Sequence, residues 1–308
     1  VQHFTDVLGG AHDTKEVVTL GTPFRGAAKT LGVLARGWPR WLPGLRSRFR
    51  RLALTLPSVY ELLPRYQAIV DGTERRRLAG TDLSRTDSEQ ERFERASAFH
   101  NGLDTAGDRP YDRLVVVGSL QPTEQFARID NGAVELLKWW FAPDGSVLDE
   151  RGDGTVPRQS VTPPEWHSDH HALPLSSTHI GLPTARAVFR VLFNTLTATP
   201  REEQAEERAR LAIDAPDLVE AGTALDVCCE VADGDWEIPL LAEVQAAGAG
   251  SGHAPQTPQL RDGILVASFE GLAPGDYRVT VRPAVVMPDV SPVWDLVTIV
   301  EPEVERGA

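Results

Sequence analysis

Two loops of this 308-residue chain carry side chains suited to proton transfer. In Gly152 to Pro157 (GDGTVP), glycines flank the Asp153 carboxylate just after a strand-like region, so a tight turn can hold it in one orientation. His179 lies in a loop directly before a helix expected to start near Pro183. An imidazole, with an ordinary pKa of about 6.5, accepts and returns protons near neutral pH. An Asp-Gly turn without chemistry is the commoner use of the first segment, and a surface loop histidine is commoner than a catalytic one.

The order of these two residues along the chain matches a known catalytic arrangement. α/β-Hydrolases carry their triad in the order Ser, Asp or Glu, then His, and here Asp153 precedes His179. Their serine lies in Gly-x-Ser-x-Gly, and this pattern occurs nowhere in the 308 residues. Ser160, Ser176 and Ser177 lie beside the candidates in expected loops, without the strand–turn–helix context of a nucleophile. The sequence thus presents an acid and a base without a recognisable nucleophile.

Metal binding is the competing chemistry. Residues 166–171 (WHSDHH) place three imidazoles and the Asp169 carboxylate close together, but their spacing fits no common zinc pattern, and a solvent-facing loop is the commoner structure. The two cysteines, Cys228 and Cys229, are adjacent, which rules out a disulfide framework and a cysteine zinc site. We expect them in a strand, one facing each way. No metal and no cofactor are therefore expected.

The elements around the candidate residues indicate an α/β domain over residues 1–199. Val17 to Leu20 and Leu114 to Val117 are continuous apolar runs, typical of parallel strands that are buried on both faces. Residues 183–196 have the apolar spacing of an amphipathic helix. Residues 27–64 are rich in Leu, Arg, Trp and Pro, and we expect them to form an insertion.

Residues from 209 onward indicate an all-β domain. Short strands are expected near residues 209–213, 223–231, 238–245, 263–269, 276–282 and 294–300, with turn residues between them. That spacing is typical of a β-sandwich, and residues 272–281 (LAPGDYRVTV) resemble the tyrosine corner of immunoglobulin-like modules. The charged stretch 200–208 is the expected linker, which places the domains at 1–199 and 209–308.

Composition narrows the classes of protein further. A hydrophobic fraction of 41% and a charged fraction of 24% are ordinary for a folded chain, and the net charge of −13 disfavours nucleic-acid binding. No apolar run approaches the roughly 20 residues of a membrane span. No secretory signal is visible, but a missing N-terminus would remove one, so the compartment stays open, with the cytoplasm slightly favoured. Because the chain starts at Val1 and its only methionine is Met287, we expect a fragment or a processed chain.

Five segments carry a resemblance to a known family. They are residues 17–26 (VVTLGTPFRG), 56–64 (LPSVYELLP), 115–123 (VVVGSLQPT), 152–157 (GDGTVP) and 173–179 (LPLSSTH). In this order they resemble the lecithin:cholesterol acyltransferase-like α/β-hydrolases, the lipase and acyltransferase kind found in bacteria. The resemblance spans about residues 1–197. It implies that residues 1–199 are the C-terminal part of an α/β-hydrolase domain, and the strand pattern places a small immunoglobulin-like β-sandwich after it.

The resemblance implies a serine hydrolase or acyltransferase acting on lipid-like acyl esters, with Asp153 as triad acid and His179 as general base. Residues 1–10 (VQHFTDVLGG) resemble the helix after the family's serine, so the nucleophile would fall a few residues before Val1. The oxyanion donors and first sheet strands would be missing too, and we expect this N-terminally truncated chain to be inactive alone. The cluster around Trp38 and Trp41 would be a lid or acyl-chain site, although such clusters are more often core.

A hypothesis from another class stays open. It is a non-catalytic binding or adaptor protein on a degenerate hydrolase fold, whose β-sandwich docks a protein partner that the sequence does not identify. Retention of Asp153 and His179 in matching contexts argues against it. The upstream sequence discriminates, because a Gly-x-Ser-x-Gly there supports the enzyme and its absence supports the adaptor.

Overall fold

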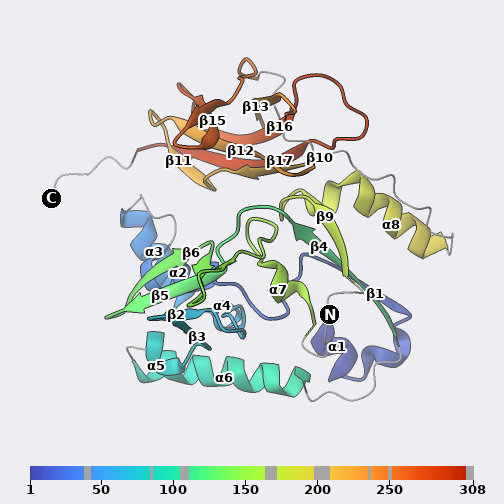
Figure 1. The fold of residues 1–308 in the computed structure, drawn as a ribbon. Coiled ribbons are helices and arrows are strands. Elements are labelled where there is room, and N and C mark those ends of the chain that lie inside the picture. Colours follow the sequence, from blue (N-terminus) through green and yellow to red (C-terminus); the bar gives the residue numbers. More distant parts are fainter. Residues whose placement is uncertain are drawn as a thin grey trace. The chain divides into compact units, whose positions relative to one another are not determined.

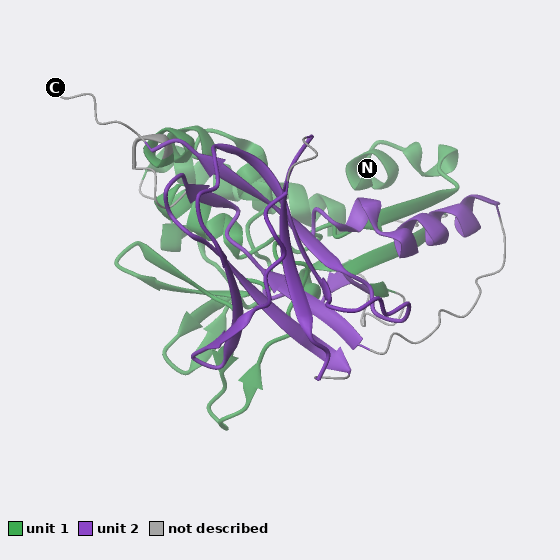
Figure 2. Ribbon diagram, turned by 90° about the horizontal axis from the view of Figure 1, so that it is seen from above, with its two compact units in different colours: residues 1–117, 123–174 green, residues 118–122, 175–308 purple. Residues whose placement is uncertain are grey.

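A computed structural model describes residues 1–37, 43–83, 86–104, 111–163, 172–197, 209–234, 237–248 and 252–302. The chain forms two compact units, coloured separately in Figure 2. Unit 1 comprises residues 1–117 and 123–174, and unit 2 comprises residues 118–122 and 175–308. Residues 118–122 and 175–197, expected in the first domain, thus belong to the same compact unit as the all-β region. The linker expected at 200–208 lies outside the described residues.

Helices and short strands follow one another from the N-terminus to the start of the second unit (Figure 1). In chain order they are α1 (Gln2–Asp6), η1 (Gly10–Asp13), β1 (Glu16–Leu20), α2 (Lys29–Arg36), α3 (Pro43–Ala53), α4 (Pro57–Glu61), β2 (Ile69–Asp71), β3 (Glu74–Arg76), α5 (Gly80–Leu83), α6 (Asp87–Asp104), β4 (Asp112–Ser119), β5 (Phe126–Asp130), β6 (Ala133–Leu137), β7 (Trp140–Phe141), β8 (Val147–Leu148), α7 (Arg158–Val161) and β9 (Ala172–Ser176). Among the described residues, no helix has the length and apolar composition needed to cross a membrane.

The remaining elements belong to unit 2. They are η2 (Leu182–Thr184), α8 (Arg186–Thr197), β10 (Ala209–Asp214), β11 (Leu218–Glu220), β12 (Leu225–Gly234), β13 (Leu240–Ala246), β14 (Gln259–Arg261), β15 (Ile264–Phe269), β16 (Gly275–Pro283) and β17 (Val293–Val300). The helix expected from Pro183 begins at Arg186, because residues 182–184 form a 3₁₀ turn first. Val188 and Val191 are its buried residues, as the apolar spacing predicts.

The two apolar runs of the first domain form parallel strands. β1 pairs with β4 in parallel from Glu16 opposite Asp112 to Leu20 opposite Val116, and the sheet order is β1-β4-β9. Val115 and Val116 are fully buried, as continuous apolar strands of a parallel sheet require. The prediction of an α/β fold with a parallel sheet, followed by an all-β region, is confirmed.

A second sheet of unit 1 was not expected from the sequence. β5 and β6 form a hairpin, and the sheet order is β3-β2-β5-β6. The hairpin turns at Asn131 and Gly132, whose φ angles of 48° and 77° are those of a two-residue turn that matches strand twist. Asn-Gly is a strong hairpin signal, so this turn could have been predicted from the sequence. Four short strands therefore separate β4 from the loop that carries Asp153.

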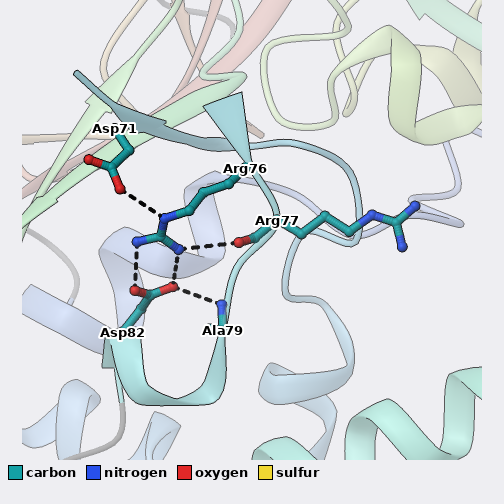
Figure 3. Close-up of polar contacts among 5 residues, drawn as sticks. All are labelled: Asp71, Arg76, Arg77, Ala79 and Asp82. Atoms are coloured by element: carbon teal, nitrogen blue, oxygen red, sulfur yellow. Dashed lines mark hydrogen bonds and ion pairs between the residues drawn. The ribbon is translucent and has the colours of Figure 1, made fainter. Parts of the chain in front are cut away.

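An arginine network closes the corner between β3 and α5 in unit 1 (Figure 3). Two Arg76 nitrogens donate to both carboxylate oxygens of Asp82, at 2.7 and 2.8 Å, and a third donates to Asp71 at 3.2 Å. The Ala79 N–H also donates to Asp82, at 2.7 Å. Burial raises the pKa of the Asp82 carboxyl, but the hydrogen bonds from Arg76 and Ala79 outweigh burial and hold the pKa below its usual value.

We expect Asp82→Asn to lower the free energy of unfolding by about 1–2 kcal/mol at pH 7, because the bidentate pair with Arg76 is lost. The folded pKa of Asp82 is depressed, so this stabilisation is present above the unfolded value, about 4, and is lost as pH falls through the folded value. Urea unfolding at pH 7 and pH 3 measures both effects. Asp71→Asn is the control, since its 70% exposed side chain should contribute under about 0.5 kcal/mol. A pH-independent loss in Asp82→Asn contradicts the prediction.

The all-β region is a β-sandwich. Its sheets have the orders β10-β12-β15-β14 and β11-β17-β16-β13, and side chains from both sheets share one apolar core. All six strands expected from the sequence are present, and β11 and β14 are short additions. The Tyr277 hydroxyl donates to the Ala273 carbonyl at 2.9 Å, which is the expected tyrosine corner.

The adjacent cysteines lie in β12 as predicted. Cys229 is buried in the sandwich core, whereas Cys228 is half-buried, because successive side chains of a strand point to opposite faces. Burial, with a smaller contribution from the neighbouring thiol, raises the pKa of Cys229 to about 12. A thiol of that pKa stays protonated at neutral pH and acts as a small apolar side chain.

Candidate active site

The loop of residues 152–157, here called the acid loop, holds the Asp153 carboxylate in unit 1. Asp153 is 1% exposed, and its Oδ1 accepts the N–H groups of Thr155 at 3.0 Å and Val156 at 2.6 Å. The Asp153 N–H donates back to the Val156 carbonyl at 3.2 Å, and a bridge between Gly152 and Pro157 closes the loop. This turn fixes the plane of the carboxylate, as the flanking glycines predicted.

Buried polar side chains from the segment after β4 support the acid loop within unit 1. Thr123 is fully buried, and its Oγ1 accepts the Gly154 N–H at 2.9 Å. Gln125 is also fully buried, and its amide donates to Asp149 and accepts from the Glu150 N–H just before the loop. The middle of the acid loop is thus tied to a side chain 31 residues earlier, and the segment just before the loop to a side chain 25 residues earlier.

We expect Thr123→Val to lower the free energy of unfolding by about 1–2 kcal/mol, because the part-buried Gly154 N–H loses its acceptor on the fully buried Thr123. Valine keeps the shape of threonine, so the effect isolates the hydroxyl. Urea unfolding measures it, and Thr123→Ser should recover most of the loss. Thr197→Val removes a hydroxyl bond of 2.7 Å at the exposed end of α8 and should cost under about 0.5 kcal/mol. Equal costs for the two valine variants contradict the prediction.

His179 lies where the sequence placed it, in a loop before a helix. The loop of residues 177–181, here called the histidine loop, joins β9 to η2, and His179 is half-buried in it. The Thr178 carbonyl accepts the Leu182 N–H at 2.9 Å, which starts the following turn. Asp153 belongs to unit 1 and His179 to unit 2.

The hydroxyl groups of the three serines near these residues donate to backbone carbonyls. Ser160 is fully buried and its hydroxyl donates to the Gly26 carbonyl. The Ser176 hydroxyl donates to the Leu211 carbonyl at 2.9 Å, and the Ser177 hydroxyl donates to the Thr178 carbonyl at 3.3 Å. These contacts suit structural serines rather than an exposed nucleophile.

Backbone at or next to residues 17–26, 56–64 and 152–157 is joined by hydrogen bonds in unit 1. The Ala27 N–H donates to the Leu62 carbonyl, and the Arg65 N–H donates to the Arg25 carbonyl, both at 2.9 Å. The Arg25 N–H donates to the Ser160 carbonyl at 3.1 Å, three residues beyond the acid loop. The loop after β1, the segment after α4 and the short helix after the acid loop are therefore joined by main-chain hydrogen bonds.

Comparison with known proteins finds similarity in solved structures. No protein-family model and no curated protein matches the chain. The PKD domain of an M14-like peptidase from a Thermoplasmatales archaeon is 14% identical over 29% of this chain and 92% of that domain, with a TM-score of 0.21. The CARDB domain of a Pyrococcus furiosus protein, solved with di-metal ions, is 16% identical over 32% of this chain and 95% of that domain, with a TM-score of 0.19.

A cavity in unit 1 was not expected from the sequence. It has a volume of about 410 Å³ and lies between α1, β1 and α6. His100 of α6 lines it, and its Nε2 lies 2.7 Å from the Glu61 carbonyl oxygen. Burial lowers the pKa of His100, so this imidazole is neutral at pH 7. No helix was predicted for residues 87–104, although the acidic residues Asp87 and Glu89 in the first turn are typical of a helix N-terminus.

The competing metal chemistry has no support in the described part of the chain. No three His, Cys, Asp or Glu side chains gather there closely enough to hold a metal ion. Residues 166–171, with their three histidines, lie outside the described residues, as do Trp38 and Trp41 of the expected lid.

Proposed function

We propose that this chain supplies the acid and the general base of a serine hydrolase or acyltransferase acting on lipid-like acyl esters. The observation that carries the proposal is the acid loop. Asp153 is buried, and a single carboxylate oxygen accepts two backbone N–H groups in a closed turn. A triad acid needs such a fixed orientation to hold an imidazole.

The proposed reaction is acyl transfer through a covalent intermediate. The serine oxygen attacks the ester carbonyl, while His179 takes the serine proton and then gives it to the leaving alkoxide. Asp153 holds the imidazole in the correct tautomer and stabilises the imidazolium. Water or an alcohol, deprotonated by His179, then releases the acyl group and restores the serine. The serine belongs, in this proposal, to a segment that precedes Val1.

The open edge of β1 supports a contribution from outside these residues. Among the described strands, β1 has β4 on one side and no strand on the other. Its sequence, Glu-Val-Val-Thr-Leu, is mostly apolar, which is unusual for an open edge. Parallel sheets are usually covered and paired, because an open apolar edge invites association. The Thr19 hydroxyl is buried without a hydrogen-bond partner among the described atoms. A further strand alongside β1 would pair this edge.

The proposal is tested with a chain extended upstream to include a Gly-x-Ser-x-Gly serine. We expect that chain to hydrolyse p-nitrophenyl esters and to be labelled by a fluorophosphonate at that serine, and we expect residues 1–308 alone to do neither. Serine→Ala in the extended chain is the control, since it should abolish both. Turnover by residues 1–308 alone would refute an outside serine. An upstream sequence without the serine motif would favour the adaptor instead.

A further inference from the structure

Unit 2 joins the β-sandwich to a loop that follows β4. β10 is an edge strand, since its sheet order is β10-β12-β15-β14. On its open side Gln121 takes the place of a neighbouring strand. The Gln121 amide nitrogen donates to the Leu211 carbonyl at 3.2 Å, and its amide oxygen accepts the Ile213 N–H at 2.9 Å. Gln121 is fully buried, so this contact satisfies a polar group that burial would otherwise penalise.

The segment around His179 is held to the same sandwich by two hydroxyl groups. The Ser176 hydroxyl donates to the Leu211 carbonyl of β10 at 2.9 Å. The Thr178 hydroxyl donates to the Trp294 carbonyl of β17 at 2.6 Å. β11 pairs with β17 only at Thr298 to Val300, so on the β11 side no described strand pairs with β17 at Trp294. One segment is thereby tied to one strand of each sheet.

We propose that the β-sandwich is the scaffold that positions the general base, with Thr178 as the positioning residue between Trp294 and His179. This inference rests on the function proposed above. Thr178 is 1% exposed and directly precedes His179. Its hydroxyl accepts the Gly181 N–H at 3.1 Å and its carbonyl accepts the Leu182 N–H at 2.9 Å. The turn of the histidine loop is therefore built on Thr178, the residue whose hydroxyl is bonded to the sandwich.

Positioning of His179 by the sandwich requires directional bonds. Apolar packing is non-directional, so it would tolerate a small slide of the loop, whereas hydrogen bonds to carbonyls in two sheets specify one geometry. Misplacing a reacting group by about 1 Å can cost on the order of 10²-fold in rate. A sandwich used in this way is part of the catalytic framework, in contrast to a module whose purpose is to dock a separate protein.

The test compares Thr178→Val, Thr178→Ser and Thr298→Val in the full 308-residue chain. Hydrogen exchange of residues 177–183 is followed by mass spectrometry. Thr178→Val should accelerate exchange at Leu182 about tenfold, because the loop loses its tie to Trp294. Gly181 is not used as a readout, because the substitution also removes the acceptor of its own N–H. Thr178→Ser keeps the hydroxyl and should exchange as the parent does. Thr298→Val removes a hydroxyl bond of 2.7 Å to Asp276 elsewhere in the sandwich and should leave the loop unchanged.

A kinetic arm in the upstream-extended chain separates positioning from general stability. Thr178→Val should lower kcat 10- to 100-fold or so with KM within about twofold, and Thr178→Ser should restore it. Unchanged exchange in the loop, or accelerated exchange with an unchanged kcat, overturns the inference. A parent without esterase activity but with accelerated exchange in Thr178→Val overturns the proposed function and not the tie between loop and sandwich. If Thr178→Val fails to fold, Ser176→Ala removes the other hydroxyl and should shift exchange in the same direction.

Discussion

Asp153→Asn is expected to lower the kcat of the upstream-extended enzyme by about 10⁴-fold while thermal unfolding stays within a few degrees of the parent. The asparagine oxygen can still accept the N–H groups of Thr155 and Val156, so the acid loop keeps its turn. The neutral amide cannot fix the imidazole tautomer or stabilise the imidazolium, so the loss should fall on the chemical step. Ester turnover gives kcat, and circular dichroism gives the unfolding midpoint.

Asp144→Asn is the matched control for this prediction. Asp144 Oδ1 also accepts an N–H two residues ahead, that of Ser146 at 2.9 Å, but in an exposed turn between β7 and β8. Its kcat should stay within about twofold of the parent. Activity of Asp153→Asn within a few-fold of the parent would remove Asp153 from the proposed triad. His179→Ala should lose activity on the same scale, because members of a triad act as a unit.

Gly26→Ala is expected to lower the free energy of unfolding by about 4 kcal/mol or more. Gly26 has a φ angle of +73°, which L-residues with a Cβ adopt only with strain. A Cβ there would collide with the Leu63 carbonyl and lie 2.7 Å from the Leu62 carbonyl oxygen. The Leu62 carbonyl is bonded to the Ala27 N–H at 2.9 Å, so this backbone cannot withdraw without breaking that bond. Urea unfolding, monitored by near-ultraviolet circular dichroism, measures the loss.

Gly72→Ala separates the collision at Gly26 from the φ angle. Gly72 has a φ of +61°, but no heavy atom lies within 4 Å of a Cβ built there. Alanine at this position should cost only about 1 kcal/mol, the ordinary penalty of a left-handed backbone. Equal losses at Gly26 and Gly72 would show that the contact with residues 62–63 is unimportant.

Local signals in the sequence predicted eight of the seventeen strands in the described part of the chain. The apolar runs of β1 and β4 and the six longer strands of the sandwich follow from side-chain patterns within a few residues. The acid loop follows from glycines on both sides of Asp153. No hairpin was predicted for residues 126–137, although Asn131-Gly132 in its middle is a strong hairpin signal.

The hydrogen bonds that hold the candidate site in place could not be predicted from local sequence signals. Thr123 meets Gly154 from thirty-one residues away, and Thr178 meets Trp294 across 116 residues. In each case one partner is a main-chain group. Every residue type has such groups, so the type of that residue does not reveal the contact. Only the donor or acceptor side chain is visible in the sequence, and a threonine or glutamine has many ordinary uses.

The carbonyls that Gln121, Ser176 and Thr178 contact have a consequence for how this protein can vary. Leu211 and Trp294 contribute their peptide oxygens, so replacing either side chain leaves the acceptor in place as long as the strand persists. The three donors lack that freedom, because valine, leucine or alanine would remove the hydrogen-bonding group itself. These hydrogen bonds therefore tolerate side-chain substitution at the two acceptor residues of the sandwich, but not at the three donor residues. A sandwich of unrelated sequence but equal strand geometry could be grafted beneath the same loops.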